Sequence, residues 1–97
     1  MKTTKEIVKE INDKKINSVH WAEDFLPDGA KKVAEMDYDE HRWYVISTEV
    51  WKVGEGFIGI NGPSSLKSES MGYDDVGIDC VAFEMKEVPS VTYVPKD

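Results

Sequence analysis

Hydrophobic residues recur at helical spacing near the start of the chain, with lysine and glutamate between them. The apolar positions are Ile7, Val8 and Ile11. Thr3 and Glu6 have the spacing of a capping box, in which each side chain bonds to the backbone of the other residue. The pattern predicts an amphipathic helix over residues 4–13 that lays its apolar face on a sheet.

After residue 30 the pattern becomes that of strands. We expect one strand at 31–38 and a clearer one at 42–53, which is rich in aromatic and β-branched residues. Apolar side chains fall on both faces of the second strand. This favours either a central strand covered on both sides or a bulge near Ser47–Glu49.

Glycine pairs and prolines predict where the remaining strands begin and end. Gly54-Glu55 predicts a tight hairpin into a strand at 56–60, which we expect Asn61-Gly62-Pro63 to end. Residues 80–85 alternate again, and residues 90–94, after Pro89, read as a final edge strand.

Two stretches lack a regular pattern. Residues 16–30 are expected to be irregular, with a turn at Pro27-Asp28-Gly29. Residues 63–78 form a long polar connection, and connections of that length often serve a function.

Together these elements predict one α+β domain over residues 1–97, with an N-terminal helix packed on an antiparallel sheet of four to five strands. The predicted core is Ile7, Val8, Ile11, Val45, Ile46, Phe57, Ile58, Val81, Phe83 and Met85.

Charge narrows the class of partner. The chain has 12 lysines and arginines against 19 acidic residues, a net charge of −7, and the excess lies after residue 32. Such a chain repels nucleic acid and attracts basic protein surfaces. The sequence has no apolar run typical of a signal peptide or a membrane span, so we expect no membrane association and a cytoplasmic location.

Cysteine content argues against several kinds of chemistry. The only cysteine, Cys80, lies in an apolar strand and is expected to pack as a small hydrophobic residue, not to act as a nucleophile with His20 or His41. With one cysteine no C-x-x-C motif is possible, so we expect no structural zinc site. No catalytic motif is present, and we expect no catalytic residue, metal or cofactor.

Gly54-Glu55-Gly56-Phe57-Ile58-Gly59 matches the G-x-G-x-x-G pattern of dinucleotide sites. In such sites the loop opens a helix, but the residues that follow here cannot continue one. The segment therefore predicts a hairpin turn.

The densest acidic run contains Glu35, Asp37, Asp39 and Glu40. It resembles the start of a calcium loop but lacks the glycine and the final glutamate of that motif. It can also be a solvated strand end, or a contact surface for a basic partner. Tyr73, Asp74 and Asp75, an aromatic residue beside two acids, form a second candidate contact.

The chain resembles the short, acidic α+β accessory proteins of bacteriophages and prophages in Gram-positive bacteria. The resemblance rests on the start MKTTKEIVKEI, the strand WYVIST, the segment Ser68–Met71 and the tail AFEMKEVPSVTY. It implies a non-enzymatic protein that binds a basic host protein, as an inhibitor or a nucleic-acid mimic.

Two other functions stay open on sequence alone. One is a small-molecule-binding domain or small enzyme with a pocket under the 63–78 connection. The other is a homo-oligomeric structural protein that assembles through an edge strand.

Overall fold

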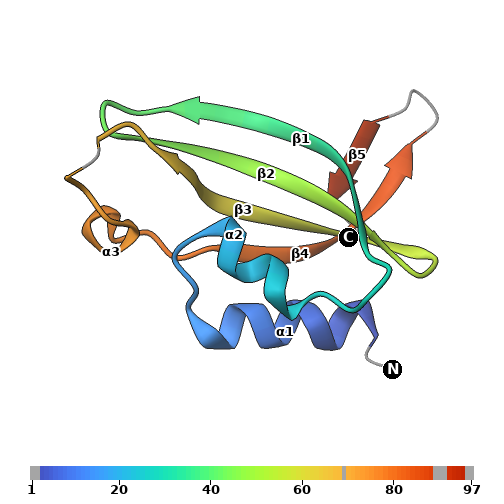
Figure 1. Cartoon of the computed structure of the whole chain (residues 1–97). Coiled ribbons are helices and arrows are strands. Elements are labelled where there is room, and N and C mark those ends of the chain that lie inside the picture. Colours follow the sequence, from blue (N-terminus) through green and yellow to red (C-terminus); the bar gives the residue numbers. More distant parts are fainter. Residues whose placement is uncertain (1–2, 69, 89–91, 96–97) are drawn as a thin grey trace.

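The computed structural model describes residues 3–68, 70–88 and 92–95 (Figure 1). Its elements, in chain order, are α1 (Thr4–Lys14), α2 (Val19–Ala22), the 3-10 helix η1 (Glu23–Phe25), β1 (Lys31–Glu40), β2 (Tyr44–Val53), β3 (Gly56–Leu66), α3 (Tyr73–Val76), β4 (Val81–Val88) and β5 (Thr92–Pro95).

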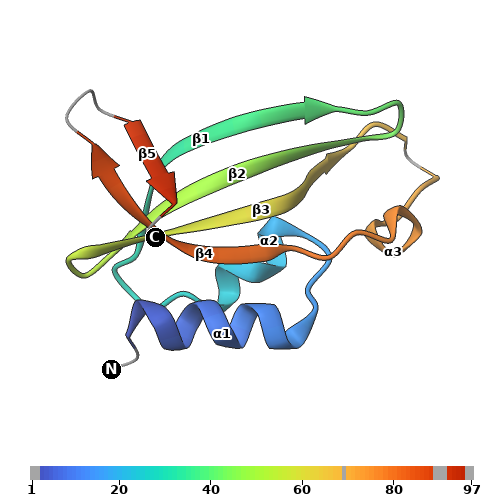
Figure 2. The ribbon, with the colours of Figure 1, turned by 180° about the vertical axis from the view of Figure 1, so that it is seen from behind.

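The strands form one antiparallel sheet in which each strand pairs with the next along the chain, in the order β1-β2-β3-β4-β5. Helices α1 and α2 lie together on one side of the sheet, and the β4–β5 hairpin bends away from them (Figures 1 and 2). The predicted α+β fold is therefore confirmed, and β5 is an edge strand as expected. The final strand was predicted at residues 90–94, after Pro89. Residues 89–91 lie outside the described residues.

Helix α1 begins at the predicted capping box. The Glu6 amide donates to Thr3 Oγ1 at 3.2 Å, and the Thr3 amide donates to Glu6 Oε1 at 3.2 Å. Ile7 and Ile11 are fully buried against the sheet. On the same side Asn12 exchanges two hydrogen bonds with the backbone of Ala82, which fixes the helix on β4.

The segment expected to be irregular, residues 16–30, contains two short helical turns that the sequence interpretation missed. The Ser18 hydroxyl accepts a hydrogen bond from the His20 amide and caps α2, which buries Val19 and Ala22. A single turn is too short to produce a helical hydrophobic repeat, so the pattern could not reveal it. The predicted Pro27–Gly29 turn is present, with Gly29 at φ 91°.

The β2–β3 hairpin forms at Gly54-Glu55, so the glycine-rich segment is a turn, as predicted. Strand β3 does not end at 61–63, however, and continues to Leu66. Beyond Asn61 it pairs with β2 alone, and a register shift falls between Val45 and Ile46. A strand accepts a proline under those conditions, which explains why Pro63 does not end it.

The main core lies between the helices and the sheet. It consists of Ile7, Ile11, Ile16, Val19, Ala22, Val53, Ile58, Ile60, Cys80 and Ala82. Ala82 on β4, and Cys80 just before that strand, face the helices. Phe83 and Met85 lie on the opposite face, over Gly59.

The predicted core is right for Ile7, Ile11, Ile58 and Met85, which are buried. Val8, Val45, Ile46, Phe57 and Phe83 are only half-buried. Val81 was wrongly assigned, because its side chain is 54% exposed. It faces away from the helices at Asn61, where the pairing of β3 with β4 ends.

Candidate functional site

The predicted acidic run lies on β1, an edge strand of the sheet. Its pairing with β2 shifts register between Met36 and Asp39, and Asp37 takes a left-handed conformation with φ 57°. Aspartate tolerates this conformation better than most residues. All four acids, Glu35, Asp37, Asp39 and Glu40, are exposed.

Neighbouring cations neutralise only part of this charge. Lys32 Nζ lies 2.5 Å from Glu35, and Lys67 Nζ lies 3.4 Å from Glu40. The Lys32 ammonium and then the Tyr38 hydroxyl hold the pKa of Glu35 below its usual value, because both donate hydrogen bonds to its carboxylate. Asp39 contacts His41 at 3.1 Å. Among the described residues, Asp37 has no ion pair.

Exposed aromatic side chains accompany the acids. Tyr38 is 62% exposed and Trp43, in the turn after β1, is 48% exposed. The Arg42 guanidinium lies 4.8 Å from the centre of the Trp43 ring. We refer to the surface formed by Glu35, Asp37, Tyr38, Asp39, Glu40 and Trp43 as the β1 acidic surface.

The second predicted group lies on α3, and its side chains serve local structure. Asp75 Oδ2 accepts a hydrogen bond from the Gly72 amide at 2.9 Å, at the start of the helix. Asp74 accepts a hydrogen bond from Asn17, and the half-buried Tyr73 ring lies 6.5 Å from that of Trp21. Trp21, at 55% exposed, is the more accessible ring of this pair. Among the described residues no hydrogen bond or ion pair joins this group to the β1 acidic surface.

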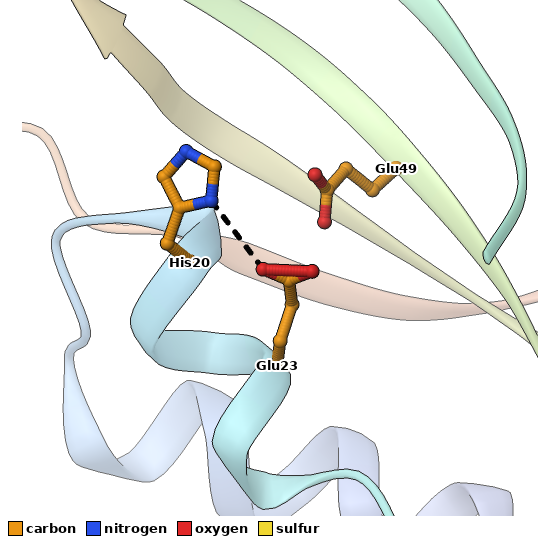
Figure 3. A group of neighbouring side chains, drawn as sticks. All are labelled: His20, Glu23 and Glu49. Atoms are coloured by element: carbon orange, nitrogen blue, oxygen red, sulfur yellow. Dashed lines mark ion pairs between the residues drawn. The ribbon is translucent and has the colours of Figure 1, made fainter. Parts of the chain in front are cut away.

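A third group, His20, Glu23 and Glu49, was not recognised in the sequence (Figure 3). One donor atom from each residue lies within 4.8 Å of the other two. His20 and Glu23 come from consecutive turns, α2 and η1, and their side chains point toward Glu49 on β2 (Figure 3). His20 Nδ1 lies 3.4 Å from Glu23 Oε2.

Hydrogen bonds from outside the group orient two of its members. His20 Nε2 lies 2.7 Å from the backbone carbonyl oxygen of Ser64 on β3. The indole Nε1 of Trp51 donates to Glu49 Oε1 at 3.2 Å. These contacts hold the imidazole and the Glu49 carboxylate in the orientations shown in Figure 3.

Glu49 is an unusual side chain for its position. Residues 49, 51 and 53 alternate onto the helix-facing side of β2, and the Glu49 side chain is only 3% exposed. Burial raises the pKa of the Glu49 carboxyl above its usual value, and the nearby Glu23 carboxylate adds to the shift. Lys32 Nζ lies 3.7 Å away.

Two signals in the sequence could have indicated this group. His20 and Glu23 are three residues apart, which places them on one side of a helical turn. Glu49 alternates with Trp51 and Val53 on one face of a strand, so an acid shares the face of apolar neighbours. Neither signal shows that α2 and η1 lie over this part of β2, because their placement depends on tertiary packing.

Cys80 is buried and 3% exposed, as its apolar setting predicted. A hollow of about 430 Å³ is lined by Thr3–Thr4, Pro27–Ala30 and Val53–Gly56. It is not formed by the 63–78 connection, so the pocket expected there stays a prediction. In the described part of the chain no helix is long and apolar enough to cross a membrane.

Comparison of the chain with models of known families, with curated proteins and with solved structures found no match. No relative therefore assigns a function to these residues.

Proposed function

We propose that this chain is a non-enzymatic interaction module that docks on a basic surface of a partner protein. The contact is the β1 acidic surface. The observation that carries the proposal is the exposure of Tyr38 and Trp43, at 62% and 48%, beside four exposed carboxylates.

Charge supports this proposal at long range. Lys32 and Lys67 pair with Glu35 and Glu40, whereas Asp37 has no cationic partner among the described residues. Residues 33–97 as a whole carry an acidic excess. A surface of this sign attracts a basic partner and raises the association rate.

The aromatic residues support the proposal at short range. Tyrosine and tryptophan dominate the binding energy of protein interfaces, because they bury a large area with few rotatable bonds. Tyr38 and Trp43 expose that area at the end of β1 and in the turn that follows. Surrounding carboxylates then form the polar rim of the contact.

The shape of β1 favours docking through side chains. A partner strand could add only to a regular edge, but the register of β1 shifts near Val33 and again around Asp37. Bulges of this kind protect sheet edges from further strand pairing. The partner would therefore contact the carboxylates and aromatic side chains of the β1 acidic surface, and not the unpaired backbone groups of the strand edge.

The resemblance to phage and prophage accessory proteins suggests the setting. We place the partner in the cytoplasm of the bacterial host, among proteins with basic surfaces. A nucleic-acid-binding protein fits this description, since an acidic surface can compete with nucleic acid for the same site. The module would then act as an inhibitor and would not bind nucleic acid itself.

A triple variant tests the proposal. Asp37→Asn, Asp39→Asn and Glu40→Gln remove charge from the β1 acidic surface with little change of shape. Proteins captured from host lysate at low and high salt are identified, and the rates of binding are measured with the purified partner. We expect the association rate to fall about tenfold at low salt, and the remaining binding to depend less on salt.

A matched control removes the same charge elsewhere. Asp24→Asn, Asp28→Asn and Glu55→Gln change exposed acids outside β1. This control should keep most of the association rate, whereas Trp43→Ala should speed dissociation. Capture of the same partner at an unchanged rate by the first triple variant would reject the β1 acidic surface as the contact.

A further inference from the structure

His20 has a fixed tautomer in its neutral form. Its Nε2 atom lies 2.7 Å from the Ser64 carbonyl oxygen, which can only accept a hydrogen bond. Nε2 must therefore carry the proton, and the lone pair is left on Nδ1. That lone pair faces Glu23 Oε2 at 3.4 Å, so two electron-rich atoms meet with no proton between them.

Glu49 brings further negative charge to the same point. Its side chain is 3% exposed, and the nearest ammonium, that of Lys32, lies 3.7 Å away. Lys32 is closer to Glu35, at 2.5 Å, and is shared between the two acids. Glu49 also accepts one hydrogen bond, from Trp51. A buried carboxylate is costly unless hydrogen bonds and cations compensate its charge, and a bound metal ion would add to that compensation.

We propose that His20 Nδ1 and the Glu23 and Glu49 carboxylates form a binding site for a divalent transition-metal ion, with Zn²⁺ as the best fit. One imidazole nitrogen and two carboxylate oxygens are a common ligand set for such ions. Mg²⁺ and Ca²⁺ prefer oxygen ligands only, and in larger number. None of its three ligands belongs to the β1 acidic surface proposed as the protein contact, although Lys32 lies between Glu35 of that surface and Glu49.

The surroundings match those of a metal site. Ligating histidines commonly donate their other ring N–H to a carbonyl or carboxylate, as His20 does to Ser64. The Trp51 indole N–H donates a hydrogen bond to the Glu49 carboxylate and so orients this second ligand. His20 is exposed, which leaves the side of the site next to it open to water as a fourth ligand.

Binding would require only side-chain adjustment. Zinc ligands lie at about 2.1 Å from the ion, so the ligand atoms of a tetrahedral site are about 3.4 Å apart. The Nδ1–Oε2 distance between His20 and Glu23 is already 3.4 Å, and no pair of the three donor atoms exceeds 4.8 Å. Since Glu49 lies on β2 and the others on α2 and η1, the ion would join the short helices to the sheet.

Calorimetric titration of the metal-free protein with ZnCl2, after treatment with EDTA and desalting, tests this proposal. We expect one equivalent to bind with a dissociation constant in the micromolar range or tighter, and Tm to rise by at least about 5 °C at saturation. MgCl2 at millimolar concentration should produce no comparable shift. Equal affinity for Mg²⁺ would reject the imidazole as a ligand.

The two histidines of the chain provide a matched pair of variants. His20→Gln and Glu49→Gln should each weaken Zn²⁺ binding at least tenfold, whereas His41→Gln should leave it unchanged. Circular dichroism and urea unfolding of each variant confirm that it is folded. Nitrogen NMR of the His20 ring adds an independent readout, because Nδ1 should carry the lone pair in the neutral, metal-free ring and its signal should shift when Zn²⁺ binds.

Three results would overturn the assignment. Zn²⁺ could fail to bind at 100 µM, a concentration at which a site with a micromolar dissociation constant would be occupied. Binding could survive in folded His20→Gln and disappear in His41→Gln, which would place the ion at the Asp39–His41 pair. The NMR spectrum could show the proton on Nδ1 of the neutral ring, which would remove the lone pair on which the site depends.

Discussion

Cys80 illustrates how the setting of a single residue controls its chemistry. The side chain is 3% exposed in the helix-facing core. Burial raises the pKa of its thiol to about 12, and the Asp79 and Glu49 carboxylates add to the shift. Because the thiolate is the reactive form, we expect this cysteine to react slowly in the folded protein.

We therefore expect slow alkylation of folded Cys80 by iodoacetamide. At pH 8 a thiol with a pKa of about 12 is thiolate in roughly one molecule in ten thousand, against about a quarter for a free cysteine. The rate, followed by mass spectrometry, should be at least about a hundredfold slower than in urea. It should also rise about tenfold per pH unit from 8 to 10. A rate that levels off near pH 9 would show an ordinary, accessible thiol.

At the scale of elements, the sequence predicted a helix start or a turn correctly where residues close together in the chain form it. The Thr3–Glu6 capping box and the Gly54-Glu55 turn are both formed within a few residues, and both were found as expected. The course of β3 past Pro63 was not predictable, because it depends on where β4 stops pairing. The same holds for α2, whose single turn is stabilised by the sheet beneath it.

The contact between β3 and β4 gives a prediction at this scale. A Cβ atom added at Gly62 would lie 2.4 Å from Cys80 Sγ and 3.1 Å from the Cys80 Cα atom. Since backbone as well as side chain must move, Gly62→Ala should lower the free energy of unfolding by about 1–3 kcal/mol. Urea unfolding measures the loss.

Two further variants control this prediction. At Gly59 the obstacles are the side-chain ends of Met85 and Phe83, which can rotate, so Gly59→Ala should cost less. Adding Cys80→Ala to Gly62→Ala removes the closest contact but not the Cα, and should recover part of the loss. Strictly additive effects of the two substitutions would show that the contact is not the cause.

At the scale of the whole molecule, the sequence predicted the exposed acidic run on β1 better than the group formed by His20, Glu23 and Glu49. The charge of the acidic run from Glu35 to Glu40 is explicit in the sequence, and four carboxylates within six residues are expected to be exposed. The approach of His20 and Glu23 to Glu49 depends on three features from separate parts of the chain. These are the helical turn capped by Ser18, the alternation of side chains along β2, and the packing of the short helices over β2. No local pattern encodes that combination.

Apolar side chains pack on both faces of the sheet, and the two layers are buried to different extents. The layer between the helices and the sheet contains Ile60, which is fully buried. On the other face Val50 and Met85 are buried, but Phe83 is only half-buried over Gly59 and Val81 is 54% exposed. The larger, helix-facing cluster should therefore contribute most of the stability, although the Phe83 ring lies on the other face.

Three alanine variants compare the layers. Ile60→Ala leaves a cavity in the enclosed layer and should cost about 2–5 kcal/mol of unfolding free energy. Phe83→Ala should cost less than Ile60→Ala although it removes more atoms, because solvent already reaches the ring. Val81→Ala should cost under about 0.5 kcal/mol, as expected for an exposed side chain. Urea unfolding with an unchanged m-value gives the order, and a larger loss for Phe83→Ala than for Ile60→Ala would show that the outer face carries the stability.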